Sequence, residues 1–493
     1  MAIGQRQLLN RQKKIFSKGE YGMVKNRPNI IFINTDQQSA SALSCAGNPY
    51  IHTPNLDRLA AKGIRFERAY AANPVCIPSR FSMFSGRYPS EIGMEGNDHH
   101  KNHVSQDILD TAMGNILVKA GYEAVYGGKI HLPGPAPVYE KVEPYGFTMR
   151  TDNYRELLAD DCIDFLRQPH EKPFIMVASF VNPHDICYYA YNEYNLLKGK
   201  RIVGHRGTLE WDACVSYRKE LEQYTEDELE RIIPPLPDNY EIPENELTCF
   251  QLDKPDFMCW SRTTWGEKEW RLLRYLYKKF VERVDAKIGR VLDAVEKSGL
   301  KDNTLILFTS DHGDMGASHR SDEKGYLYEE CSRVPFILTW KDRIQPGQVD
   351  TEHLVSSGID LIPTMCEAAG IEIPPELEGK SLLSLTMSGS AGWRNHLLIE
   401  NNLSRCIHFG DWKYMVGTNK PYPKGEKCNG CEWDCFSKPY VREQVTNIKT
   451  DPGEMRNWVG EPQAQETVRL GRKIIRDRYE KYKREIDSGY IVE

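Results

Sequence analysis

The chain has 493 residues, of which 40% are hydrophobic and 27% are charged, and its formal net charge is −6. This length is sufficient for two or three domains, and the composition is that of an ordinary globular protein. The negative charge gives no support for a nucleic-acid partner, and no apolar run approaches the roughly 18 residues that cross a bilayer. We therefore predict neither a nucleic-acid partner nor a membrane span, while the sequence does not determine the oligomeric state.

The N-terminal extension, residues 1–27, is basic but has no apolar core after its charges, so it does not resemble a secretory signal. The sequence as written predicts a cytoplasmic protein, or a periplasmic one if a signal has been removed. The 13 cysteines are scattered and odd in number, which fits a reducing compartment. The spacing of Cys428, Cys431 and Cys435 suits a zinc site with a fourth ligand from elsewhere, or pairing of thiols in an exported protein.

From residue 28 onward, predicted strands alternate with predicted helices. Residues 29–34 form a continuous apolar run, which is typical of a buried strand in a parallel sheet. The further strands are predicted at residues 122–126, 173–180, 304–309 and 334–340, and the helices at residues 53–63, 106–121, 161–167, 267–298 and 357–369. This alternation predicts an α/β catalytic domain over residues 28–393, with a large mixed, mostly parallel sheet sandwiched by helices.

The pattern changes after about residue 394. Residues 406–416 predict a hairpin around Gly410 and Asp411, and residues 462–486 predict a charged helix. We therefore expect a smaller C-terminal α+β subdomain with an antiparallel sheet over residues 394–493.

Residues 190–258 form a long, charged and proline-containing excursion, which we expect to cross the sheet edge and to form a wall for substrate. Six aromatic residues in and beside it either stack on sugar rings or pack in a core, and the sequence leaves both alternatives open. They are Tyr188, Tyr189, Tyr191, Trp211, Trp260 and Trp265.

Polar side chains follow several predicted strands at the point where each strand ends. Asp36 and Gln37 follow the first strand, and Asp311 and His312 follow the strand at residues 304–309. Ligands gather beyond the carboxyl ends of strands in open α/β sheets, and oxygen ligands suit Ca²⁺, Mg²⁺ or Mn²⁺. A single Asp after a strand is more often a helix cap or a turn former.

Further polar groups follow the strands at residues 122–126 and 173–180 and the loop after Asp311, and they share the same predicted rim. They are Lys129, His131, His184, His319 and Lys324. Each alone is typical of a solvated loop, but several strands ending in such groups indicate a common site.

Cys76 lies in the segment Cys-Ile-Pro-Ser-Arg, where Pro78 is a natural first residue of a helix. A nucleophile at this position would lie beside a helix N-terminus, whose N–H groups and dipole favour an anion. Arg80, one turn later, would add a forked cationic donor. A lone cysteine in such a loop is otherwise usually a small buried hydrophobic residue.

These motifs, in this order, resemble the type I formylglycine-dependent sulfatases of the alkaline-phosphatase-like superfamily. The matching segments are residues 33–38, 76–80, 127–131, 182–184, 309–314, Lys324 and 448–457. The resemblance implies an alkaline-phosphatase-like fold and a sulfuric-ester hydrolase. It also implies that a formylglycine-generating enzyme oxidises Cys76 to formylglycine, an aldehyde whose hydrate is the nucleophile.

The resemblance further implies a divalent cation, usually Ca²⁺, with Mg²⁺ or Mn²⁺ as alternatives. Its ligands would be Asp36, Gln37, Asp311 and His312, with the modified residue 76 completing the shell.

The remaining roles implied by the resemblance are catalytic. Arg80 and Lys129 would stabilise the nucleophile, and His131 would remove the proton of its second hydroxyl. His184 and Lys324 would bind the sulfate and protonate the leaving alcohol. We add His319 as a further expected substrate-binding residue.

The pairs Asp36-Gln37 and Asp311-His312 differ from the Asp-Asp and Asp-Asn pairs of many sulfatases. They resemble the branch that holds choline sulfatases, phosphonate monoester hydrolases and some carbohydrate sulfatases. We therefore expect a sulfatase that acts on a small-molecule or oligosaccharide sulfate ester, most of all on a sulfated carbohydrate. The alternatives are a phosphonate monoester or phosphodiester hydrolase, a choline-sulfatase-like enzyme, and an inactive saccharide-binding homologue.

Overall fold

The computed structural model describes residues 27–418 and 440–482, except for 95, 98–100, 135–139, 154, 205–206, 252–253 and 390. Cys428, Cys431 and Cys435 lie outside the described residues, as do almost all of the N-terminal extension and the last residues of the predicted C-terminal helix. In the part of the chain that is described, no helix combines the length and apolar character needed to span a bilayer.

An eight-stranded mixed sheet forms the centre of the molecule, with the strand order β5-β4-β6-β1-β7-β8-β2-β9. The five strands from β5 to β7 run parallel to one another, whereas β8 is antiparallel to both of its neighbours. The strands of this eight-stranded sheet are β1 (Asn29–Asp36), β2 (Ile64–Phe66), β4 (Glu123–Gly128), β5 (Thr148–Thr151), β6 (Phe174–Pro183), β7 (Thr304–Ser310), β8 (Phe336–Trp340) and β9 (Gln348–Asp350). Two short strands, β3 (Ala69–Tyr70) and β10 (Val355–Ser356), pair separately.

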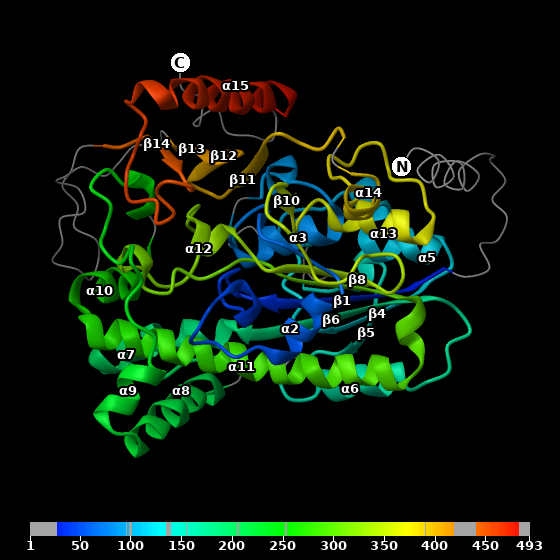
Figure 1. The fold of residues 1–493 in the computed structure, drawn as a ribbon, viewed down its shortest axis with the longest axis horizontal. Coiled ribbons are helices and arrows are strands. Elements are labelled where there is room, and N and C mark those ends of the chain that lie inside the picture. The colour runs from blue at the N-terminus through cyan, green and yellow to red at the C-terminus, as the bar shows by residue number, and fades with distance from the viewer. Residues whose placement is uncertain are drawn as a thin grey trace, which may run out of the picture.

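Helices cover both faces of this sheet (Figure 1). One face packs on α2 (Pro54–Ala61), α6 (Leu158–Leu166) and α11 (Glu267–Lys297). The other packs on α3 (Cys76–Ser85), α5 (Met113–Lys119), α13 (Leu361–Ala369) and α14 (Leu382–Ser388). Alternate residues of β1 point to opposite faces, so Ile31 and Ile33 enter the first core and Ile30 and Phe32 the second. Both faces are therefore buried, which explains the continuous apolar run of this strand.

Two predicted helices differ from the structure. Residues 106–121 form two helices, α4 (Gln106–Asp110) and α5, because the chain leaves helical geometry at Thr111 and Ala112. The Thr111 hydroxyl donates to a carbonyl of the preceding turn. The helix predicted from residue 357 begins only at Leu361, because the Asp360 carboxylate accepts the backbone N–H of Ser356 and closes a turn there.

The excursion after β6 is largely helical and packs against the N-terminal half of α11. Its helices are α7 (Cys187–Leu197), α8 (Leu209–Glu220), α9 (Glu226–Ile232) and α10 (Asp256–Thr264). Most of its aromatic residues form a core: the Tyr189 ring contacts Trp211 and Trp265, and Trp260 contacts Trp265. Tyr188 instead lies beside His184, and its ring meets that imidazole edge to face.

A second, four-stranded antiparallel sheet lies beyond the main one (Figure 1). It consists of β11 (Leu397–Glu400), β12 (Ser404–Phe409), β13 (Trp412–Gly417) and β14 (Glu443–Asn447), with α15 (Gln465–Lys481) packed against it. The predicted hairpin is present, because Phe409 pairs with Trp412 across Gly410 and Asp411. The buried Lys413 ammonium ties this sheet to the catalytic layers through an ion pair with Glu329.

Candidate active site

Four adjacent strands of the main sheet bring the predicted site residues together. In the order β4-β6-β1-β7, the carboxyl ends of these parallel strands meet at one edge. Lys129 follows β4, His184 follows β6, Asp36 ends β1 and Asp311 follows β7. Residues that are far apart in the sequence therefore share one buried rim.

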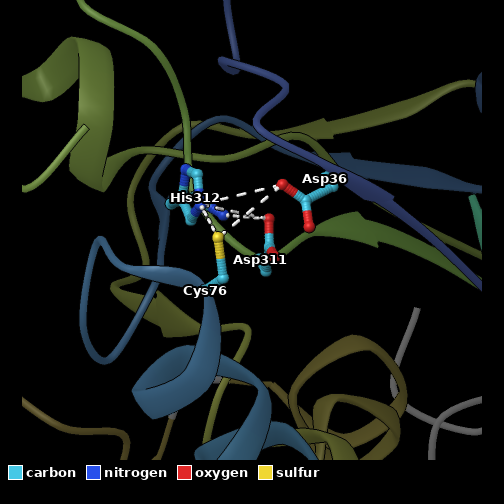
Figure 2. A group of neighbouring side chains, drawn as sticks. All are labelled: Asp36, Cys76, Asp311 and His312. Carbon is cyan, nitrogen blue, oxygen red and sulfur yellow. Dashed lines mark hydrogen bonds and ion pairs between the residues drawn. The ribbon is translucent and has the colours of Figure 1, made fainter. Parts of the chain in front are cut away.

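Asp36, Cys76, Asp311 and His312 converge, each offering one ligand atom, and these four atoms lie within 4.8 Å of one another (Figure 2). The Cys76 Sγ is 3.2 Å from His312 Nε2 and 3.9 Å from Asp36 Oδ1. All four side chains are buried. Two carboxylates, an imidazole and a position that would bear hydroxyls after oxidation form a donor set that suits a divalent cation.

The His312 ring is oriented by its own backbone neighbourhood. Its Nδ1 lies 2.8 Å from the Gly313 carbonyl oxygen, which can only accept, so Nδ1 carries the hydrogen. The Nε2 atom then faces the group around Cys76. This is the arrangement in which second-shell contacts prepare a histidine to bind a metal. Burial opposes a charge on this ring, but Asp311 and Cys76 raise its pKa to about 9, so a metal ion bound at Nε2 would displace a proton.

Arg80 holds the two carboxylates in place. Its Nη2 lies 2.9 Å from Asp36 Oδ2, and its Nε lies 2.9 Å from Asp311 Oδ2. The Nη1 group donates to the Ser179 hydroxyl at 2.8 Å and to the Lys129 carbonyl at 3.1 Å. The guanidinium is fully buried, so its charge is balanced by these fixed acceptors rather than by water.

The two carboxylates have opposite pKa shifts. Burial opposes the charge of Asp36, but Lys129, His184 and Arg80 together hold its pKa well below the usual range. Burial and the nearby Asp36 charge raise the pKa of Asp311. A bound divalent cation would remove this conflict, because it favours the ionised form of both groups.

Cys76 is the first residue of α3, and the N–H of the next residue, Ile77, donates to Asn97 Oδ1 at 3.0 Å. Burial and Asp36 oppose ionisation of the thiol, but Lys324, Lys129 and His312 together hold its pKa well below the usual value. The sulfur marks the position that the hydroxyls of a hydrated formylglycine would occupy. That position therefore favours an oxyanion.

Lys129 and His131 reach the site from the end of β4. Gly128 turns the chain there with φ of 103°, and a Cβ at this position would lie 2.1 Å from the Ser179 carbonyl oxygen. The Lys129 ammonium lies 2.7 Å from Asp36 Oδ2. Burial and the Lys129 charge lower the pKa of His131, so its imidazole is held neutral.

Lys324, Gln37 and Asp314 form a chain of polar contacts beside the four-atom group. The Lys324 ammonium donates to Gln37 Oε1 at 2.8 Å, and Gln37 Nε2 donates to Asp314 Oδ2 at 2.7 Å. The Cys187 thiol also donates to Gln37 Oε1, at 2.9 Å. The structure thus places the Gln37 side chain on Lys324, whereas the sequence-based prediction made it a metal ligand.

His184 and His319 occupy different surroundings. The His184 Nε2 lies 4.0 Å from Asp36 Oδ1, within the site, and burial and Lys129 hold its pKa well below the usual value. The His319 ring is fully buried, and its Nε2 lies 2.8 Å from the Gly453 carbonyl oxygen of the C-terminal region. The structure therefore does not place His319 with the other predicted site residues.

The sulfatase family model matches residues 28–371, and the model described as "N-sulphoglucosamine sulphohydrolase, C-terminal" matches residues 317–481. The first match covers well over half of the chain. The chain belongs to the sulfatase family. This membership confirms the sulfuric-ester hydrolase that the motifs predicted, and the mixed sheet with its separate antiparallel sheet confirms the predicted fold class.

Relatives of this sulfatase align along most of its length. It is 26% identical to an N-acetylglucosamine-6-O-sulfatase of Bacteroides thetaiotaomicron, over 93% of this chain and 87% of the relative. It is 25% identical to a Delta 4,5-hexuronate-2-O-sulfatase of the same organism, over 93% of this chain and 90% of the relative.

A solved structure shares the fold of this sulfatase. A protein crystallised in complex with its substrate D-glucosamine-2-N,6-O-disulfate superposes with a TM-score of 0.70 at 21% identity, over 95% of this chain and all of that chain.

Proposed function

We propose that this sulfatase removes sulfate from a sulfated carbohydrate, with formylglycine formed at Cys76 and Ca²⁺ held by Asp36, Asp311 and His312. The observation that carries the proposal is the convergence of these four side chains in one buried group. The carbohydrate is supported by the relatives, which are described as sulfatases of N-acetylglucosamine and hexuronate. Maturation then requires a formylglycine-generating enzyme as a partner.

Formylglycine and the divalent cation would supply two kinds of chemistry. Formylglycine, when present, supplies a hydrated aldehyde as the nucleophile. A divalent cation lowers the pKa of a bound hydroxyl and polarises an ester oxygen. The chain's own residues would orient these groups, neutralise developing charge and move protons.

Lys129 and His131 act on the nucleophile side of the site. The Lys129 ammonium, fixed on Asp36, lies where it stabilises negative charge on the oxygen at position 76. His131 is held neutral by burial and by Lys129, so its imidazole is able to accept a proton from a second hydroxyl there.

Lys324 and His184 act on the sulfate side. The Lys324 ammonium carries its positive charge toward residue 76, and Gln37 fixes its direction. A sulfate ester placed there would be held by this cation, and the charge on its oxygens would be stabilised during transfer. The His184 Nε2, 4.0 Å from Asp36 Oδ1, is available to exchange a proton with the leaving alcohol.

Sulfate release from defined saccharides tests the proposed function. Matured protein with Ca²⁺ is expected to release inorganic sulfate from at least one monosulfated or disulfated sugar, such as N-acetylglucosamine-6-O-sulfate. Paired aryl sulfate and aryl phosphonate substrates provide the control for the type of ester. Turnover of the phosphonate with no release of sulfate from any sugar or aryl sulfate would contradict the proposal and favour the phosphonate hydrolase alternative.

The variant Gln37→Leu tests whether Gln37 positions Lys324 or binds the metal ion. Because the Gln37 amide contacts Lys324 and Asp314, we expect its loss to raise KM about ten-fold, the size of one lost charge-assisted hydrogen bond. The Ca²⁺ affinity, measured by calorimetric titration, is expected to stay nearly unchanged, whereas Asp311→Asn should reduce it strongly. A large loss of Ca²⁺ affinity in Gln37→Leu would instead make Gln37 a metal ligand.

A further inference from the structure

One lysine beside the site is not used by the mechanism above. Lys254 lies between the short 3₁₀ segment Thr248–Gln251 and α10, at the end of the excursion that follows β6. Its ammonium lies 3.6 Å from the centroid of the Tyr326 ring. Tyr326 comes two residues after Lys324, so the excursion places a second cation next to the segment that carries the sulfate-binding lysine.

Gly325 connects Lys254 to the nucleophile loop. A Cβ built on Gly325 would lie 3.8 Å from the Lys254 Nζ and 3.7 Å from the Val75 Cγ2. Val75 directly precedes Cys76, and the Gly325 N–H donates to the Pro74 carbonyl oxygen at 3.0 Å. The Lys254 ammonium and the residue before the nucleophile therefore both lie within 4 Å of the same point beside Gly325.

Within the described part of the chain, the Lys254 ammonium has no carboxylate partner, whereas Arg80 and Lys129 are both paired with Asp36. The Lys324 ammonium donates to the neutral Gln37 amide and lies 3.9 Å from Glu323 Oε2. Among the described residues, none presents a carboxylate within 4.0 Å of the Lys254 ammonium or accepts a hydrogen bond from it.

The Tyr326 ring explains how this ammonium is held without an acid. A cation over an aromatic face is attracted by the ring quadrupole, and an ammonium with three N–H donors does not need all of them for this contact. Lys254 is partly exposed, whereas Tyr326 is buried, so the ring is a fixed platform and the N–H groups remain available to a ligand.

We propose that Lys254 is a specificity-determining residue that binds a second anionic group of the substrate, next to the sulfate that is cleaved. The group is a carboxylate or a further sulfate on the same saccharide, because both present oxygens to an ammonium. This assignment rests on the proposed function and deepens it: the preferred substrate is a saccharide with at least two negative charges. A substrate with the scissile sulfate alone leaves Lys254 without a partner.

Binding to an inactive variant tests this assignment without turnover. Cys76→Ala protein, which lacks the nucleophile, is titrated calorimetrically with N-acetyl-D-glucosamine-6-O-sulfate and with D-glucosamine-2-N,6-O-disulfate. A second pair, a hexuronate-2-O-sulfate and its carboxyl methyl ester, tests the carboxylate as the source of the charge. The same titrations are made with Lys254→Met, with Lys254→Arg, and with Lys200→Met as the control for loss of an exposed lysine on the same excursion, each in the Cys76→Ala background.

The assignment predicts that Lys254→Met weakens binding of the doubly charged member of at least one pair about ten-fold, the size of one charge-assisted hydrogen bond. The singly charged member should change little, which also shows that the variant is folded. Lys254→Arg should retain most of the preference, and Lys200→Met all of it. The pair that responds identifies the second group as sulfate or carboxylate.

Three results would overturn the assignment. Lys254→Met could weaken binding of both members of each pair equally, or it could weaken binding in neither pair. The third such result is that no doubly charged probe binds. The proposed function fails in a different way. Matured protein that binds the disulfate through Lys254 but releases no sulfate from any substrate would contradict the sulfatase proposal and leave the role of Lys254 standing.

Discussion

Cys76→Ala is expected to lower sulfate release on the order of a thousand-fold or more, because it removes the group from which the nucleophile is made. The thiol is buried among Asp36, His312 and the N-terminus of α3, and the change deletes a single sulfur atom there. We therefore expect the variant to remain folded, with a thermal transition close to that of the unmodified protein. Steady-state release of sulfate from an aryl sulfate and from the best saccharide measures the loss.

Cys45→Ala is the matched control for this prediction. Cys45 is a half-buried cysteine beside Asp57, in the 3₁₀ segment Ser44–Ala46. Its replacement should leave sulfate release unchanged. Turnover by Cys76→Ala within ten-fold of the unmodified protein would contradict a nucleophile at this position.

Arg80→Met is expected to destabilise the metal-free protein by about 3–5 kcal/mol, the usual cost of removing one partner from a buried ion pair. The guanidinium is fully buried and contacts both Asp36 and Asp311, so its loss leaves two neighbouring carboxylates without their shared cation. The same change should abolish sulfate release, because both carboxylates belong to the group around Cys76. Urea denaturation with a chelator present measures the free energy of unfolding.

Arg167→Met provides the comparison for the loss of an arginine. Arg167 is mostly exposed, and its guanidinium lies 4.0 Å from Asp164, a distance at which surface pairs contribute little. Its free energy of unfolding should change by less than about 0.5 kcal/mol. If Arg80→Met also changed the free energy of unfolding by less than about 0.5 kcal/mol, the buried ion pairs of Arg80 would not stabilise the fold.

The strands that carry the site could be predicted closely from the sequence. β1, β6 and β7 are buried on both faces by helices, so each is a continuous apolar run that ends in polar residues. The predicted helix over residues 106–121 was wrong because its break at Thr111 depends on a local hydroxyl contact that apolar periodicity does not detect. The delayed start of α13 has a similar cause in the Asp360 carboxylate.

The residues at strand ends were predictable because neighbouring parallel strands share one edge, but their orientation was not. Gln37 follows Asp36 directly, yet its backbone adopts φ of 70° and its amide joins Lys324 and Asp314. His319 follows the same strand as Asp311, yet its ring contacts the Gly453 carbonyl from a segment more than a hundred residues away. Such contacts are determined by tertiary packing, which a motif does not encode.

Other side chains near the site were missed altogether. Asn97, Ser179 and Cys187 contact Ile77, Arg80 and Lys324 respectively, and they are linked to those residues only in the folded chain. The Arg80 Nη1 lies 2.8 Å from the Ser179 hydroxyl oxygen, and the Lys324 Nζ lies 3.4 Å from the Cys187 sulfur. The apolar or polar character of the segments around them gave no signal for these roles.

The aromatic residues of the excursion show why composition alone could not distinguish a sugar-stacking surface from a packed core. Tyr189, Trp260 and Trp265 have the residue type of a sugar platform, but they pack against each other beside α11. Their packing anchors the excursion, and Lys254 near its end contacts the Tyr326 ring. Of the six aromatic residues, Tyr188 is the one whose ring contacts a predicted site residue, His184.

The mass of the peptide that contains Cys76 tests the central claim most directly. Protein produced together with a formylglycine-generating enzyme, and active on a sulfate ester, should yield this peptide with the mass of the aldehyde or its hydrate. The fraction converted should rise in proportion to the specific activity across preparations. Fully active protein whose Cys76 peptide carries only the unmodified thiol would contradict the account.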